Sequence, residues 1–152
     1  MTEYLFETYT EEETKRLASK LAILLSPGDV VTLEGDLGVG KTTFTKGGLG
    51  GAGLGVRRTI NSPTFTIVKE YMGEIPLYHM DVYRIENSEE DIGFEEYFNG
   101  EGVTIVEWAS FIKEFLPEKR LDIEITRKDE YIRKIVFKPI GSYFDEICKE
   151  LY

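Results

Sequence analysis

The feature that most restricts the fold of this chain is a glycine-rich octapeptide, residues 35–42, that directly follows a short apolar run. It reads Gly-Asp-Leu-Gly-Val-Gly-Lys-Thr and matches the pattern G-x-x-x-x-G-K-[ST] in full. Its glycines permit a tight turn whose backbone N–H groups cradle phosphates, and a following helix presents the positive end of its dipole. The preceding run, residues 30–33, favours a buried strand. The sequence therefore predicts a strand–loop–helix unit that binds phosphate.

Two side chains of this motif and one directly after it have roles that polyphosphate chemistry defines. Lys41 offers a point charge to the terminal phosphates, the Thr42 hydroxyl suits Mg²⁺, and Thr43 adds a donor for an inner phosphate. A glycine-rich turn that binds nothing is the structural alternative, but the strand before the motif and the helix start after it favour phosphate binding. The residues expected to bind nucleotide are Gly35, Gly38, Val39, Gly40, Lys41, Thr42 and Thr43.

The remaining sequence alternates helical and strand patterns. Thr10 and Glu13 form a capping box, and apolar residues at helical spacing follow as far as Leu25. Because strands alternate with helices, we expect one three-layer α/β domain over residues 1–152, with a parallel core and antiparallel strands added on one side. Further strands are expected at residues 65–71, 77–83, 103–106, 121–125 and 131–137, and further helices toward Phe98, at residues 111–116 and at residues 143–151.

Two carboxylates follow strand-like runs, where a phosphate-binding loop needs an acid to hold the metal or its water. Glu107 follows the cleaner apolar strand and is the better metal candidate, whereas Asp81 could orient water or support the metal shell. His79 lies two residues before Asp81, so both project from one strand face. A catalytic role for His79 stays open, but a structural hydrogen bond is the simpler interpretation. For Trp108, core packing and a place near the nucleotide are equally open.

Composition restricts the class of protein. The chain has 152 residues, 18 Lys and Arg against 28 Asp and Glu, and a formal net charge of −10. This field repels a phosphate backbone at long range, so we expect no autonomous nucleic-acid binding. One cysteine, Cys148, excludes an internal disulfide and multi-cysteine metal sites. No apolar run could span a bilayer and the first residues lack the pattern of a secretory signal, so we expect no membrane association and a cytoplasmic location.

A second glycine-rich segment, residues 47–55, lies just beyond the motif. Residues 48–53 formally match the dinucleotide pattern G-x-G-x-x-G, but no strand precedes them, so NAD binding is rejected. Each glycine inside a helix costs about 1 kcal/mol relative to alanine. We therefore expect the helix after the motif to be short or dependent on packing.

Several motifs together resemble one known family. They are the phosphate-binding motif, the tetrapeptide at residues 62–65 (Ser-Pro-Thr-Phe), residues 78–84 (Tyr-His-Met-Asp-Val-Tyr-Arg), residues 93–98 (Gly-Phe-Glu-Glu-Tyr-Phe) and the pair Glu107-Trp108. In this order they resemble TsaE, also known as YjeE, the bacterial P-loop ATPase family of tRNA threonylcarbamoyladenosine modification. The match extends over nearly the whole chain and departs from the family pattern at residues 47–55, where the family shows fewer glycines.

The resemblance implies a small α/β ATPase that uses ATP and Mg²⁺. It further implies that hydrolysis sustains tRNA modification by a complex of the proteins TsaB and TsaD, which would carry the transferase chemistry and the contact with tRNA. In this family pattern Lys41 and Thr42 serve phosphate and Mg²⁺, Glu107 completes the metal site, and Asp81 supports hydrolysis.

The same resemblance implies roles for residues outside the phosphate loop. Ser62, Pro63, Thr64 and Phe65 are similar to a switch segment that senses the γ-phosphate, and Trp108 is grouped with them. Thr10 and Arg133 are assigned to the nucleotide because the family's capped first helix and late strand approach it. A helix cap and a surface charge explain these two residues as well.

Three other functions stay open at this point. A GTPase is disfavoured because the sequence has neither Asn-Lys-x-Asp nor Asp-x-x-Gly. A small-molecule kinase usually brings several lid arginines over the phosphates, and here only Arg57, Arg58 and Arg84 are plausible. A nucleotide-gated adaptor would bind ATP without productive hydrolysis.

Overall fold

The computed structural model describes residues 2–35, 39–41, 43–45, 58–61, 68–73, 75–82 and 94–152, and for residues 58–61 only the backbone. Eight strands in these ranges form one sheet with the order β1-β8-β7-β2-β6-β5-β4-β3. The strands are β1 (Tyr4–Thr8), β2 (Val30–Glu34), β3 (Arg58–Asn61), β4 (Val68–Met72), β5 (Leu77–Asp81), β6 (Val103–Glu107), β7 (Arg120–Arg127) and β8 (Arg133–Ile140). The helices are α1 (Glu11–Leu24), α2 (Phe94–Phe98), the 3-10 helix η3 (Ala109–Phe115) and α3 (Ser142–Leu151).

The sheet has a parallel centre and antiparallel strands at both edges. β2 runs parallel to β7 and β6, and β6 runs parallel to β5. β8 and β1 extend one edge in antiparallel fashion, and β4 and β3 extend the other. The expected mixed sheet is confirmed, but the expectation of antiparallel strands on one side was wrong, because the strands predicted at residues 65–71 and 131–137 lie on opposite sides of the parallel centre, as β4 and β8. β1 and β3 were not predicted; each is an edge strand of at most five residues, too short for a clear alternation.

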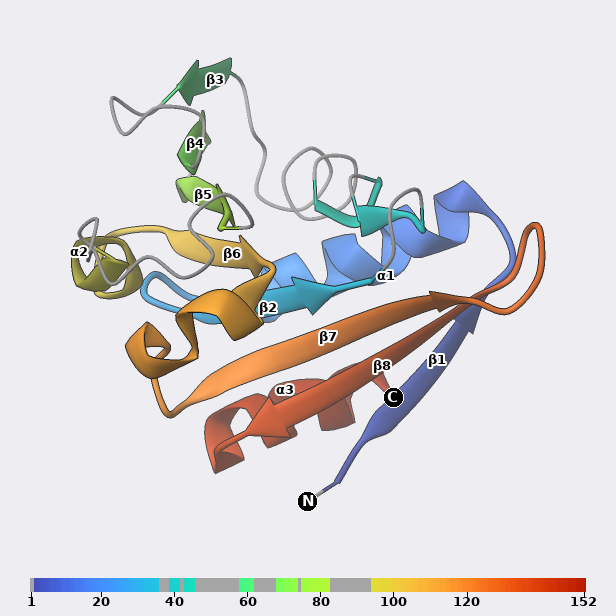
Figure 1. Ribbon diagram of the computed structural model, residues 1–152. Helices are drawn as coiled ribbons and strands as arrows, with labels where there is room; N and C mark the ends of the chain where they lie inside the picture. Colours follow the sequence, from blue (N-terminus) through green and yellow to red (C-terminus); the bar gives the residue numbers. More distant parts are fainter. Residues whose placement is uncertain are drawn as a thin grey trace.

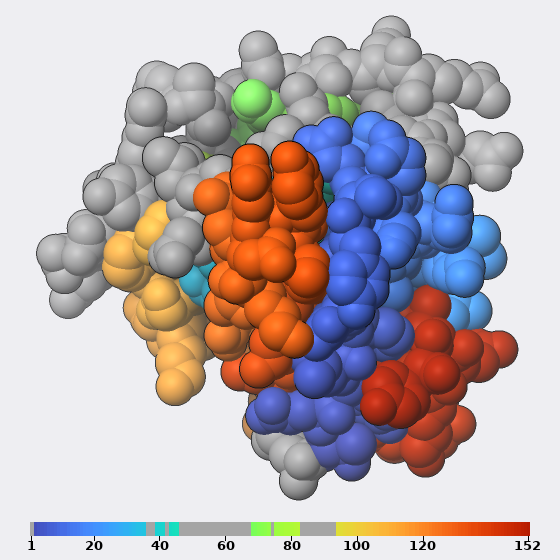
Figure 2. Space-filling model, turned by 90° about the vertical axis from the view of Figure 1, so that its right-hand side faces the viewer, coloured from blue at the N-terminus to red at the C-terminus, as the bar shows by residue number. Residues whose placement is uncertain are grey.

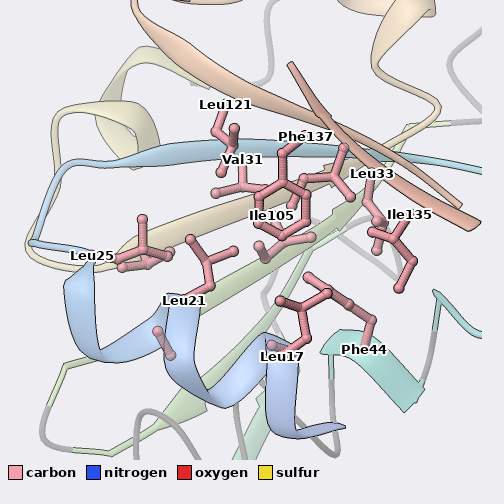
Figure 3. Packing of buried hydrophobic residues seen from close by; sticks show 14 of the residues in the cluster. Leu17, Leu21, Leu25, Val31, Leu33, Phe44, Ile105, Leu121, Ile135 and Phe137 are labelled. Carbon is pink, nitrogen blue, oxygen red and sulfur yellow. The ribbon is translucent and has the colours of Figure 1, made fainter. Parts of the chain in front are cut away.

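The helices form two outer layers. α1 and α3 contact each other and cover one face of the sheet, while on the other face α2 packs against β6 and η3 packs against β2 (Figure 1). Leu17 and Leu21 of α1 point toward the side chains of the central strands, and Phe44 joins them from the segment after the phosphate-binding motif (Figure 3). This arrangement confirms the three-layer α/β fold.

Most predicted elements are present, with differences at their ends. The hydroxyl of Thr10 accepts from the Glu13 amide at 3.1 Å, so the predicted cap of α1 is confirmed. The helix expected at residues 111–116 is instead a 3-10 helix that begins at Ala109 and ends before Pro117. The segment 47–55 and the first residues of the strand expected at 65–71 lie outside the described residues.

Within the part of the chain that the structure describes, no helix has the length and apolar character needed to cross a membrane.

Candidate functional site

The site is built where the parallel strands end. Glu107 is the last residue of β6, and its Cα pairs with Leu33 of β2 on one side and with Asp81 of β5 on the other. In-register residues of parallel strands project to the same face, here the face covered by α1. The glycine-rich motif leaves β2 at this same edge. Sheet pairing therefore brings the phosphate loop and two acids together, as the sequence predicts.

Two glycines of the loop are required by its geometry. A Cβ at Gly35 would lie 2.7 Å from the Ile125 carbonyl oxygen and 2.8 Å from Val39 Cγ1, closer than real Cβ atoms come. Gly40 has φ +119°, a conformation that side chains rarely adopt. Directly after it, the Phe44 amide donates to the Gly40 carbonyl at 2.9 Å and begins the helical turn. The fully buried Phe44 ring anchors this turn in the core.

Lys41 and Glu107 form a nearly buried ion pair. Lys41 Nζ lies 3.4 Å from Glu107 Oε1, and the two side chains are only 9% and 11% exposed. Burial alone would raise the pKa of Glu107, but the hydrogen bond with His79 and the electrostatic interactions with His79 and Lys41 outweigh it, so the pKa is lowered. The carboxylate is therefore ionised at neutral pH, and it holds the Lys41 ammonium at the strand end.

Trp108 completes the surroundings of this pair. The Lys41 ammonium lies 5.0 Å from the centroid of the indole ring, which is a cation–π contact. The indole also stacks on Phe111, with centroids 6.0 Å apart and planes 10° from parallel. Trp108 has φ 61° and ψ 36°, the one positive φ at a non-glycine residue in the described ranges. Trp108 also packs against the second buried cluster, so both interpretations left open by the sequence have a contact that supports them.

His79 contacts the second oxygen of the same carboxylate. Its Nε2 is hydrogen-bonded to Glu107 Oε2. The sequence predicted a structural hydrogen bond for His79 and a shared strand face with Asp81, and β5 confirms both. It could not identify Glu107 as the partner, because this depends on the register that sets Asp81 opposite Glu107.

A small cavity of about 110 Å³ lies beside the loop. Five residues that the sequence assigned to nucleotide line it together, namely Thr10, Val39, Gly40, Thr43 and Arg133. Three lining residues were missed: Glu11, Thr14 and Tyr131. Tyr131 is 71% exposed and lies in the β7–β8 turn, because β8 begins only at Arg133; the expectation of a strand from residue 131 was wrong there and hid this residue's place beside the loop.

Arg133 ties the loop to the β7–β8 turn. Its Nε donates to the Val39 carbonyl at 2.8 Å, and one terminal nitrogen donates to the carbonyls of Asp129, Glu130 and Ile132 at 3.2–3.3 Å. Thr8 of β1 pairs with Arg133, so β1, the turn and the loop meet at this corner, which faces the viewer in Figure 2. Arg133 is therefore half-buried and bonded to backbone carbonyls, and it is not the exposed surface charge that was considered as an alternative.

A larger cavity of about 250 Å³ lies apart from this site, between β7 and η3. Four of its charged residues form two ion pairs, Arg120 with Asp122 and Lys138 with Glu124. Arg120 Nε donates to Asp122 at 2.9 Å, and the Thr32 hydroxyl donates to the same oxygen at 2.6 Å. None of its lining residues belongs to the phosphate loop, so it does not compete as the candidate site.

The residues present fit a magnesium ion that is bound together with phosphate. The described ranges contain no group of three or more His, Cys, Asp or Glu side chains that could hold a metal by themselves. Mg²⁺ commonly takes one or two carboxylates and completes its shell with phosphate oxygens and water. The ionised carboxylate of Glu107 supplies such a ligand beside the loop.

Several predicted site residues lie outside the described ranges: Gly38, Thr42, Ser62, Pro63, Thr64 and Phe65. Their assigned roles stay predictions. Asp81 is exposed at the end of β5, in register with Glu107, and its role in hydrolysis also stays a prediction.

The sheet order, the layers and the loop at the end of β2 define a three-layer, P-loop NTPase-like α/β domain. The family model described as "Threonylcarbamoyl adenosine biosynthesis protein TsaE" matches residues 8–135. The chain belongs to the TsaE family.

Individual relatives agree with this assignment. The tRNA threonylcarbamoyladenosine biosynthesis protein TsaE of Bacillus subtilis is 53% identical over 152 residues, covering 99% of this chain and 95% of the relative. The TsaE protein of Treponema pallidum is 42% identical over 116 residues, covering 75% of this chain and 84% of the relative. The crystal structure of Bacillus subtilis YdiB superposes with a TM-score of 0.83 at 48% identity, covering 99% of this chain and 94% of that one.

Proposed function

We propose that this protein is the ATP-binding and ATP-hydrolysing subunit required for the threonylcarbamoyladenosine modification of tRNA, acting in the cytoplasm on a complex of TsaB and TsaD. Relatives that carry the TsaE name are described as proteins of tRNA threonylcarbamoyladenosine biosynthesis. The partners would carry the transferase chemistry and the contact with tRNA. The observation that supports the ATPase part is the Lys41–Glu107 pair, which joins the motif lysine to a strand-end acid beside the phosphate loop.

The proposed chemistry assigns one task to each group. Loop amides and the ammonium of Lys41 bind the phosphates, and Lys41 exchanges Glu107 for them as they arrive. Glu107, with Thr42, would then hold Mg²⁺, which supplies charge neutralisation at the phosphate oxygens. Asp81 would orient the attacking water. The cavity lined by Thr10, Thr43 and Arg133 would receive the nucleoside.

The test is a reconstituted modification assay with TsaB, TsaD, tRNA and ATP. We expect Lys41→Ala and Glu107→Ala to lower multi-turnover modification on the order of 100-fold, because each removes a group that stabilises phosphate charge. Exposed neighbours provide matched controls, Lys113→Ala and Glu114→Ala, which should retain activity. Full turnover by both site variants would contradict the ATPase proposal.

Stability has to be measured beside activity. Removing Glu107 leaves the buried Lys41 ammonium without its carboxylate, which costs about 3–5 kcal/mol, whereas removing Lys41 leaves Glu107 still bonded to His79. The double variant Lys41→Met/Glu107→Gln removes both charges and should unfold at a higher temperature than Glu107→Ala. Loss of modification in a folded double variant would separate the loss of chemistry from unfolding.

The same assay distinguishes the alternative functions. Phosphorylation of a metabolite by the protein alone would favour the small-molecule kinase. Modification without ATP turnover would favour the nucleotide-gated adaptor.

A further inference from the structure

His79 is the chain's one histidine, and its imidazole is fixed on two sides. Its side chain is 16% exposed, and Nε2 is hydrogen-bonded to Glu107 Oε2. The neighbouring strand β4 supplies the second contact, since the ring of Tyr71 lies 6.4 Å from the imidazole centroid at a tilt of 31°. Tyr71 is itself only 4% exposed. The imidazole thus has little room to turn away from the carboxylate.

The two oxygens of Glu107 have different partners. Oε1 faces Lys41 at 3.4 Å, and Oε2 is bonded to His79. If Lys41 moves to an incoming phosphate, Oε1 loses its partner while Oε2 keeps its own. The carboxylate would then present a single oxygen toward the loop, in an orientation set by β5.

We propose that His79 is a positioning residue, which holds Glu107 by Oε2 so that Oε1 is directed at the Mg²⁺–nucleotide in the phosphate loop. This inference rests on the proposed function, because it assigns to Glu107 the task of binding the ion. Residues that orient a metal ligand through a hydrogen bond typically contribute about 10- to 100-fold to metal affinity or activity. The contacts of His79 described above are with Glu107 and Tyr71. His79 therefore acts on the ion through Glu107.

The test compares His79→Leu, which removes the donor, with His79→Gln, whose amide nitrogen can take the place of Nε2. Tyr78→Leu is the matched control, because Tyr78 is a half-buried ring on the opposite face of the same strand. Calorimetric titration with ATP is run in EDTA and across a series of Mg²⁺ concentrations. We expect His79→Leu to raise the half-saturating Mg²⁺ concentration by about tenfold or more and to change ATP affinity in EDTA by less than about twofold. His79→Gln should recover most of the loss.

Two outcomes would overturn the positioning role. If His79→Leu and Tyr78→Leu behave alike, the histidine only supports the strand. If His79→Leu weakens ATP binding equally with and without Mg²⁺, it does not act through a metal ligand. Failure of the proposed function looks different, because the wild-type protein would then show no Mg²⁺-dependent ATP binding at all.

The hydrogen bond has a readout that needs no nucleotide. With one histidine in the chain, the ¹⁵N spectrum of the imidazole reports on His79 alone. We expect Nε2 to carry the proton in the ligand-free protein and its resonance to shift in Glu107→Gln. An unchanged Nε2 resonance in that variant would contradict the contact.

Discussion

At the scale of single residues, Lys41 joins the glycine-rich motif to the end of β6. Its ammonium contacts the carboxylate of Glu107 and the face of the Trp108 indole. The motif and the strand pattern predicted an acid at a strand end near the loop, but the ion pair between Lys41 and Glu107 was not predicted, since Lys41 was assigned to phosphate. The left-handed backbone of Trp108 could not be predicted, because a bulky residue adopts it only where surrounding structure imposes it.

This contact predicts an optical signal. Trp108 is the chain's one tryptophan, so its emission reports directly on the ammonium beside it. We expect Lys41→Met to shift or brighten the emission of the ligand-free protein, because the neighbouring positive charge is gone. ATP with Mg²⁺ should change the emission of the wild type and leave that of the variant nearly constant. Steady-state fluorescence measures this, with Lys113→Met as control, and identical spectra for wild type and Lys41→Met would disprove the contact.

At the scale of elements, the termini of α1 followed from sequence and the sheet edges did not. The cap at Thr10 and the stop before Pro27 are local signals, which short segments encode by themselves. β1 and β3 have weak local patterns and form strands because they pair with other strands. β1 pairs with β8, which is far away in the sequence, and β3 pairs with β4, which is the next strand. A 3-10 helix at Ala109–Phe115 likewise follows from the turn at Trp108, which tertiary structure imposes.

The cap of α1 allows a stability prediction. The Thr10 hydroxyl accepts from the Glu13 amide at 3.1 Å, and Thr10→Ala removes that acceptor. We expect the free energy of unfolding to fall by about 1 kcal/mol, whereas Thr10→Ser, which keeps the hydroxyl, should stay within about 0.5 kcal/mol of wild type. Urea denaturation followed by circular dichroism measures both variants. Equal stability of Thr10→Ala and wild type would mean that the cap contributes nothing.

At the scale of the whole molecule, the larger core joins α1, α3 and the central strands, and the phosphate loop is anchored in it through Phe44. The three-layer α/β architecture could be predicted because helix and strand periods alternate along the chain, and the observed sheet with helices on both faces confirms it. The order of the outer strands could not be read from these periods, since they do not specify which strand pairs with which.

Cys148 reports on the integrity of this core. The thiol is fully buried, and burial, aided by the negative charge of Asp145, raises its pKa from the ordinary 9.0 to about 12. In the unfolded chain the thiol loses its proton near pH 9, whereas the folded protein retains it, so stability should fall as pH rises between about 9 and 12. Urea denaturation at about pH 8 and about pH 10 should show a smaller loss for Cys148→Ala than for wild type. An equal loss would exclude the thiol as a cause.

The Arg133 anchor has a mechanical consequence. One guanidinium grips the Val39 carbonyl of the phosphate loop and three carbonyls of the β7–β8 turn, two parts of the chain far apart in sequence. The turn lies at the surface, with Tyr131 largely in solvent. A partner protein that binds this turn and displaces it would therefore also displace the Val39 carbonyl, because Arg133 connects the two. Such a partner would change the shape of the phosphate loop without contacting the loop itself.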